Sequence, residues 1–301
     1  MATIKNRLLF FTTSPRTPSK MIPEIKLLND NFEDEIWNVS TQKEFMDKLS
    51  KSDFFEGKGS SSNKDFSARD RITRAPKSLG FVDLKPVIKL TEAGNALVYG
   101  NRPKEIFLRQ LLKFQLPSPY HVEHKSIQGT FYIRPYLEIL RLIRELEYIS
   151  FDEFKIFAVQ MTDYRKFDSI KNKILQFRND KKNNVGKYKQ FVGITWENAI
   201  LEIYKDRIVK GQTKTRETQD ASLQKFIKTQ KGNMRDYADA CFRYLRYTEL
   251  VAISQKNRSI SIFKDKLIEV DYILKNVERK PVFINDLKNY KEYLFSSSNP
   301  V

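Results

Sequence analysis

Two Arg-Asp pairs, Arg69-Asp70 and Arg235-Asp236, each belong to a basic amphipathic segment that is followed by two short β-prone runs. Arginine can meet guanine through two parallel hydrogen bonds in the major groove, and aspartate can accept from cytosine or orient a neighbouring arginine. A helix followed by a β-hairpin is the end of a winged helix, whose recognition helix fits the major groove. The repeated plan therefore predicts sequence-specific binding of double-stranded DNA.

The first Arg-Asp segment has apolar residues at three-to-four spacing, which predicts a helix with one buried face. Pro76 is predicted to end or kink this helix. Gly80 suits the position after a helix end, and residues 81–84 and 87–90 are predicted as the two strands of a wing. The candidate DNA contacts in this segment are Arg69, Asp70, Arg71, Arg74 and Lys77.

The second segment keeps helical spacing of apolar residues from Leu223 to Leu245. Gly232-Asn233 is predicted to interrupt it, with Asn233 as the N-cap of a helix that runs to about Tyr247. Residues 250–253 and 259–262 are predicted as wing strands. The candidate DNA contacts are Asn233, Arg235, Asp236, Asp239, Arg243 and Arg246. Alternatively, these side chains form ordinary surface pairs along a helix; the net charge and the wing-like runs favour DNA contact.

Other residues are candidates for contacts to phosphate rather than to bases. Arg16 lies in a proline-flanked turn, where it contacts a phosphate or is simply solvated. The basic segment 170–189 can follow a phosphate backbone or serve as a solubilising surface. The candidates for phosphate contacts are Lys85, Lys181, Lys182, Lys228 and Lys231.

The remaining reactive side chains predict no catalytic or metal site. His121 and His124 are the two histidines, and with no cysteine nearby they are interpreted as residues of a surface loop. Cys241 falls at a core position of the second helix, which predicts a buried thiol. A single cysteine also excludes an intrachain disulfide.

Composition limits the class of protein and of partner. The chain has 54 Lys+Arg against 37 Asp+Glu, a net charge of +17, which favours polyanions. A hydrophobic content of 40% indicates folded domains. We predict a mainly α fold with small β-hairpins (α+β), in two winged-helix-like subdomains, residues 1–125 and 126–301. No apolar run near 18 residues and no secretory signal are found, which predicts a cytoplasmic protein without a membrane partner.

Several motifs together resemble a known family of restriction enzymes. The chain is similar, in order from about residue 12 to 270, to the N-terminal half of the AlwI family of type IIS restriction endonucleases, which includes strand-nicking enzymes. The matching runs start at Ser14 (SPRTP), Phe66 (FSARDRI), Thr91 (TEAG), Asn101 (NRPKEIFL), Leu175 (LQFRN), Arg235 (RDYADA) and Arg243 (RYLRYT).

The resemblance implies a two-part recognition module that binds a short asymmetric duplex site. It also implies that a separate C-terminal domain, with a PD-(D/E)xK-type centre that uses Mg²⁺, cuts a few base pairs away. This chain is expected to lack that domain, so cleavage requires a catalytic domain or subunit outside residues 1–301. No cofactor is expected in the chain itself, and Mg²⁺ belongs to the absent domain.

Two alternatives remain open at this point. Such a nuclease centre needs an acid-x-Lys triplet, and three occur, at residues 24–26, 83–85 and 286–288. Short triplets arise by chance, so a self-contained nuclease is the less favoured alternative. The other is a transcriptional or replication-initiator DNA-binding protein, which would use the same helices without a nuclease and dimerise on repeated half-sites.

Overall fold

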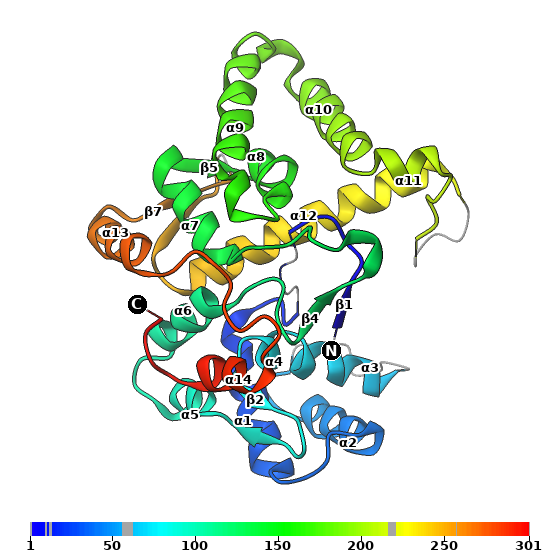
Figure 1. Cartoon of the computed structure of the whole chain (residues 1–301). Coiled ribbons are helices and arrows are strands. Elements are labelled where there is room, and N and C mark those ends of the chain that lie inside the picture. Colours follow the sequence, from blue (N-terminus) through cyan, green and yellow to red (C-terminus); the bar gives the residue numbers. More distant parts are fainter. Residues whose placement is uncertain are drawn as a thin grey trace.

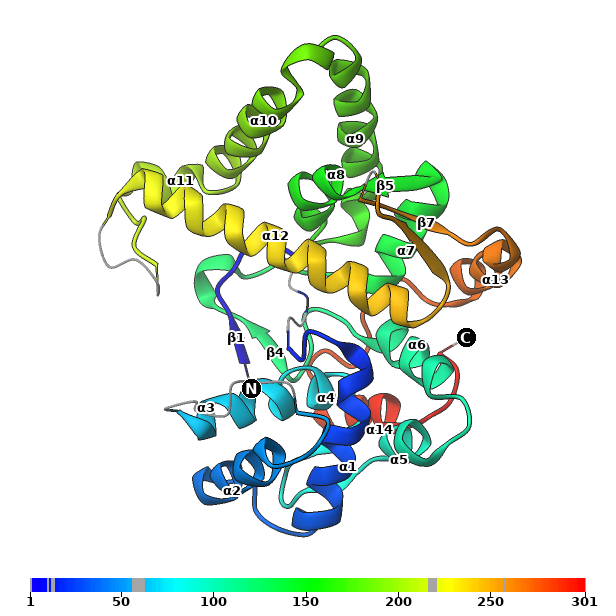
Figure 2. The same cartoon turned by 180° about the vertical axis from the view of Figure 1, so that it is seen from behind.

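The computed structural model of the chain describes residues 2–9, 11, 14–55, 63–215, 221–256 and 258–300. It is mainly helical with short strands, which confirms the predicted α+β class. Helix α12 (Leu223–Tyr247) lies between a group formed by α1 to α6 with α14 and a group formed by α7 to α11 (Figures 1 and 2). No helix among the described residues is long and apolar enough to cross a membrane.

The first half of the chain contains a helix, a second helix, a broken helix and a hairpin. These elements are η1 (Pro18–Lys20), α1 (Met21–Phe32), α2 (Val39–Ser50), α3 (Lys64–Ala68), the π-helical turn η2 (Arg69–Thr73), α4 (Ala75–Ser78), β2 (Val82–Asp83) and β3 (Lys89–Leu90). The predicted hairpin is confirmed, with Val82 opposite Leu90. The chain between α1 and α2 lies along the edge of this hairpin. There Asp34 N–H donates to Ile88 O at 2.9 Å, and Ile88 N–H donates to Glu35 O at 2.8 Å.

The predicted effect of Pro76 on the first helix is confirmed in part. The helix breaks two residues earlier, at Arg74, whose ψ of −96° is outside the helical range. Pro76 then lies in the first turn of α4, where a residue without an N–H is tolerated. The Arg-Asp pair itself lies in the π-helical turn that continues α3, so this segment is two pieces divided at Arg74 rather than one rod.

Two further helices and a parallel strand pair complete the first half. They are α5 (Glu92–Tyr99), α6 (Pro103–Lys113), β1 (Ala2–Ile4) and β4 (His121–Glu123), followed by η3 (Lys125–Ile127). The Thr91 hydroxyl caps α5 by accepting from Gly94 N–H at 2.9 Å. A Cβ on Gly94 would lie 1.9 Å from the carbonyl oxygen of Phe81, so only glycine lets α5 approach the hairpin this closely.

The second half repeats the same order with a third strand in the sheet. Its elements are α7 (Pro135–Leu146), β5 (Tyr148–Ser150), α8 (Phe151–Ile156), α12, β6 (Val251–Ser254) and β7 (Ser259–Ile262). The antiparallel sheet has the order β5-β7-β6, so the strand after the first helix joins the second strand of the hairpin. Ser150 and Glu153 form a reciprocal capping box at the start of α8.

A helical insertion separates α8 from α12, and we call it the arm. It contains η4 (Ala158–Gln160), η5 (Tyr164–Lys166), α9 (Phe167–Lys182), η6 (Val185–Lys187), α10 (Tyr188–Ile203) and α11 (Lys205–Val209). Helices α9 and α10 form two sides of a triangle that α12 closes (Figure 1). Helix α10 packs against both α8 and α12.

The predicted interruption of the second helix at Gly232-Asn233 is wrong. Helix α12 is continuous over 25 residues, and its N-cap is Ser222 rather than Asn233. A glycine inside a helix costs only about 1 kcal/mol relative to alanine. Buried residues on both sides of it, including Phe226 and Met234, keep the helix packed against its neighbours. The predicted burial of Cys241 is confirmed.

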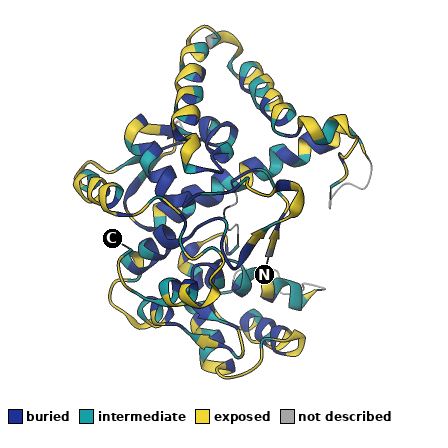
Figure 3. Cartoon of the chain, viewed as in Figure 1, coloured by how far each residue is buried: buried dark blue, intermediate teal, exposed yellow. Residues whose placement is uncertain are grey.

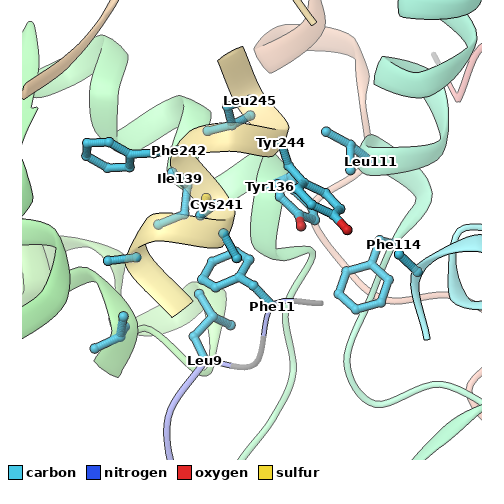
Figure 4. Close-up of a cluster of buried hydrophobic side chains, with 14 of the residues drawn as sticks. Leu9, Phe11, Leu111, Phe114, Tyr136, Ile139, Cys241, Phe242, Tyr244 and Leu245 are labelled. Atoms are coloured by element: carbon cyan, nitrogen blue, oxygen red, sulfur yellow. The ribbon is translucent and has the colours of Figure 1, made fainter. Parts of the chain in front are cut away.

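One hydrophobic cluster connects the two halves. Leu9 and Phe11 of the N-terminal segment lie beside the buried face of α12, on the side of Cys241 (Figure 4). The rings of Tyr136 in α7 and Tyr244 in α12 are stacked with centroids 6.3 Å apart. The middle of α12 is correspondingly buried (Figure 3). The predicted division of the chain at residue 125 stays a prediction.

The C-terminal segment crosses from the second half back to the first. It contains η7 (Lys264–Lys266), α13 (Leu267–Asn276), which packs on α7, and α14 (Leu287–Phe295), which packs on α5. Gln110 Nε2 donates to Leu79 O at 2.8 Å and also reaches Leu294 O. Lys291 Nζ of α14 pairs with Asp83 Oδ2 of β2 at 2.6 Å.

Candidate nucleic-acid interface

The loop of residues 14–18 lies between the two Arg-Asp helices. The buried Tyr244 hydroxyl of α12 donates to Pro15 O at 3.1 Å, which fixes the loop to the second helix. On one side of the loop, Arg16 lines a cavity of about 410 Å³ together with Asp70 and Arg71. On its other side, Thr17 lines a cavity with the residues Pro18, Lys104, Arg243 and Arg246. The loop therefore brings predicted residues from both halves together.

The arginines of the first Arg-Asp helix are each held by an acidic partner. Arg69 pairs with Asp65 at 3.0 Å, and Arg74 pairs with Asp70 at 2.8 Å. Arg71 pairs with Glu24 of α1, and its guanidinium lies 5.0 Å from the centre of the Phe55 ring.

Glu24 is buried, unlike the acidic partners of Arg69 and Arg74. It is 2% exposed, and its Oε2 atom has no hydrogen-bond partner among the described residues. Burial raises the pKa of this carboxyl group, and the neighbouring Arg71 counteracts the rise. A charge this far from water needs its partner, so Arg71 has a structural role in addition to any contact with a ligand.

The two lysines predicted near the first hairpin differ in exposure. Lys85 is exposed between β2 and β3. Lys77 is half-buried, with its Nζ 5.0 Å from the centre of the Tyr120 ring. Burial lowers the pKa of Lys77, and the positive charge of Lys85 adds to the effect. Of the two, Lys85 is therefore the more accessible to a phosphate.

The second Arg-Asp helix presents its cations more openly. Arg235 has 63% of its side chain exposed, and only a long contact of 3.7 Å joins it to Asp236. Arg246 is exposed, whereas Arg243 pairs with Asp239 at 2.7 Å along the helix. Asn233 is half-buried on the same helix.

The lysines predicted as phosphate contacts are divided between the arm and α12. Lys181 and Lys182 are exposed at the end of α9, and Lys228 is exposed on α12. Lys231 pairs with Glu197 of α10 at 3.1 Å and lies 5.8 Å from the centre of the Trp196 ring. It therefore connects the arm to α12 as well as carrying charge.

A larger cavity, of about 1100 Å³, brings Arg235, Lys181 and Lys182 together with Lys256 and Arg258 of the second hairpin. The last two were not among the predicted contacts. The sequence could have identified them by their position between two predicted strands, because a basic residue at the tip of a wing is accessible to the DNA backbone.

None of the three acid-x-Lys triplets forms part of an acidic cluster. Glu24 is paired with Arg71, Asp83 is paired with Lys291, and Asp286 accepts from Asn289 N–H at 3.1 Å as the N-cap of α14. The described part of the chain contains no group of three His, Cys, Asp or Glu side chains placed to hold a metal ion. These carboxylates do not fit the Mg²⁺ centre that the resemblance implies.

The prediction of a surface loop for both histidines is wrong for His121. This residue lies in β4 and is 6% exposed, with its ring nitrogens 3.4 Å from Ser78 Oγ and 3.3 Å from Ser118 Oγ. Burial lowers the pKa of His121 to about 4, and the charge of Lys77 adds to the effect. His124 is exposed, as predicted.

Comparison with known proteins identifies the family. A match to the AlwI restriction endonuclease family spans residues 77–299. No curated protein matches the chain at a significant level. The matched span includes the first hairpin, the arm, α12 and the second hairpin, and it covers most of the sequence. The chain therefore belongs to the AlwI restriction endonuclease family.

Proposed function

We propose that this chain recognises a short sequence in duplex DNA on behalf of a type II restriction enzyme. Restriction endonucleases act on DNA, so family membership implies DNA as the partner. The observation that carries the proposal is the loop of residues 14–18, which is hydrogen-bonded to α12 through Tyr244 and lines one cavity with Asp70 and Arg71 and another with Arg243 and Arg246. The helices α12 and α3–η2–α4 are the proposed readers of base edges.

The repeated order of elements supports two winged-helix-like subdomains. Each half has a helix, an extended segment, a second helix, a third helix and a hairpin. In both halves the extended segment joins the hairpin on the side of its second strand, through β5 in one case and residues 34–35 in the other. In a winged helix, the third helix of this order enters the major groove.

The side chains of α12 suit direct reading of bases. Arg235 and Arg246 are exposed on a helix whose opposite face is buried, so their guanidinium groups can extend into a groove. Arginine that meets the O6 and N7 atoms of guanine discriminates by about 1 to 3 kcal/mol for each good pair. Asp239 holds Arg243 at 2.7 Å, which orients that guanidinium for the same task.

The differences between the two helices favour an asymmetric target. Palindromic sites arise from identical helices related by two-fold symmetry. Here one chain carries two unlike helices, so the target is expected to be short and asymmetric, as for a type IIS or strand-nicking enzyme. Cleavage is assigned to a Mg²⁺-dependent catalytic domain or subunit outside the described residues.

Selection of bound duplexes from a random pool tests this proposal. We expect a short asymmetric consensus. Arg235→Ala should weaken binding to that consensus by about 1 to 3 kcal/mol and relax the preference at one position. The matched control Lys275→Ala removes an exposed charge from α13 and should leave the preference unchanged. A pool without enrichment, or a palindromic consensus, would contradict the proposal.

A further inference from the structure

We infer that the cavity between the arm and the second hairpin binds the sugar–phosphate backbone of one DNA strand. We call it the arm–hairpin cavity. The inference rests on the proposed function in taking DNA as the ligand, but it adds a separate site with its own residues. It makes the arm a clamp that holds the duplex beside the bases that α12 reads.

Four parts of the chain that are distant in sequence form the cavity. The end of α9 and the start of α10 provide one wall, and β5 with the start of α8 provides another. The turn of the second hairpin contributes Lys256 and Arg258, and α12 contributes Arg235. The site therefore continues directly into the proposed base-reading face of α12.

The charge of the lining is strongly positive. Seven lysines and arginines line the cavity, against two carboxylates, and both carboxylates already have partners. Asp152 pairs with Lys155 and accepts from the Tyr188 hydroxyl at 2.7 Å. Glu153 accepts from Arg178 Nε at 2.9 Å. The five remaining cations are Lys181, Lys182, Arg235, Lys256 and Arg258.

Each large ring of the lining has a cation over it. Arg258 lies 3.9 Å from the centre of the Phe151 ring, and Arg178 lies 4.2 Å from that of Tyr148. Lys155 lies 4.3 Å from the Trp196 ring and Lys181 lies 4.8 Å from the Tyr188 ring. Attraction between cation and ring restricts these flexible side chains, so their positive ends are held in position before a ligand arrives.

The same stacks indicate which part of a nucleic acid the cavity accepts. Proteins that bind unpaired strands stack bases on aromatic rings. Here the cations cover ring faces that bases would need. Small-molecule pockets, in turn, are mostly apolar, whereas nine of the 17 residues that line this cavity are charged. Phosphates of a paired strand therefore fit the lining better than unpaired bases or an apolar small molecule do.

The test is the salt dependence of DNA binding by a triple variant. Lys181→Ala, Lys182→Ala and Lys256→Ala remove three exposed charges from the cavity and leave every ring stack except that of Lys181. The slope of log K against log salt should become shallower by about 0.9 for each phosphate that the variant no longer neutralises. Base preference should stay the same, and phosphate ethylation should cease to interfere at one group of positions beside the consensus.

A matched triple variant controls for net charge. Lys264→Ala, Lys275→Ala and Lys280→Ala remove the same number of exposed charges from η7, α13 and the segment after it, outside this cavity. We expect a smaller change of slope and no change in ethylation interference. Thermal unfolding of both variants should match the unmodified chain, because all six side chains are exposed.

The outcomes separate this inference from the proposed function. If the cavity variant keeps the affinity, slope and interference pattern of the unmodified chain, the inference is wrong even when a consensus is selected. Loss of base preference in the variant would also overturn it, because the cavity would then read bases. A shallower slope on random duplex in a chain that selects no consensus would support the cavity and overturn the proposed function.

Discussion

The two Arg-Asp helices carry similar residues but place them in different surroundings. In the first half, the helix is broken at Arg74, and Arg69, Arg71 and Arg74 each pair with an acidic side chain. In the second half, α12 is continuous, and Arg235 and Arg246 extend into solvent. The comparison shows that an arginine's role depends on its acidic neighbours at least as much as on its position in a motif.

This difference predicts a structural role for Arg71 that the exposed cations of α12 do not have. Arg71 joins the broken helix to Glu24 of α1, so its removal should cost folding stability. Arg69 and Arg74, by contrast, pair with carboxylates of their own segment. The exposed cations of α12 contribute little to folding and are available to DNA. Substitutions in each half test this difference between structural and exposed cations.

The largest expected effect is that of Gly94→Ala. The added methyl group would lie 1.9 Å from the carbonyl oxygen of Phe81, so α5 must move away from the first hairpin. A backbone clash of this kind should lower the free energy of unfolding by about 4 kcal/mol. Urea denaturation measures it, with Gly193→Ala as the control, because a Cβ at Gly193 meets nothing within 4 Å. An unchanged midpoint for Gly94→Ala would mean that the hairpin is not packed this tightly.

Arg71→Ala should destabilise the protein more than Arg235→Ala does. Removal of Arg71 leaves the Glu24 carboxylate buried without its ionic partner, at a cost of about 3 kcal/mol. Arg235 is 63% exposed, so its removal should change stability by less than about 0.5 kcal/mol. Equal losses of stability in the two variants would remove the distinction between the halves.

The pH dependence of Arg71→Ala sharpens this test. Burial already raises the pKa of Glu24, and the loss of Arg71 should raise it further. The folded state then binds more protons at this site than the unfolded state, so the variant should regain stability as the pH falls towards the range in which Glu24 is protonated. Glu24→Gln in the same background should abolish this recovery of stability at low pH.

The sequence predicted those features that depend on neighbours along the chain. The helical spacing of apolar residues identified the buried face of α12, and the β-prone runs identified both hairpins. It did not predict features that depend on distant partners. Glu24 is 47 residues from Arg71, and β5 joins its sheet from beyond the arm. His121 becomes buried because β4 pairs with the N-terminal strand β1.

His121 should make the first half sensitive to acid. Its pKa is about 4 in the fold and 6.5 in the unfolded chain, so the unfolded state binds a proton first as the pH falls. The stability due to this site is complete above about pH 6.5 and is lost progressively towards pH 4, by about 3 kcal/mol. His121→Gln should flatten the stability curve in this window. The exposed His124 provides the control, and an equal effect of His124→Gln would contradict the assignment.

The smallest expected effect is at Gly232, and it has the opposite sign to that of Gly94→Ala. A Cβ at Gly232 meets nothing within 4 Å, and the residue lies inside the continuous helix α12. Gly232→Ala should therefore raise the free energy of unfolding by about 0.5 to 1 kcal/mol, because alanine loses less backbone entropy in a helix.

Asn233→Ala distinguishes a continuous helix from the interrupted one that the sequence suggested. If Asn233 caps a separate helix, its replacement should cost about 1 kcal/mol. Inside a continuous helix the same change should be neutral or slightly stabilising, because alanine has the higher helix propensity. Stabilisation by both Gly232→Ala and Asn233→Ala would show that α12 remains one rod in solution, so that Arg235 and Arg246 keep a fixed spacing along a DNA groove.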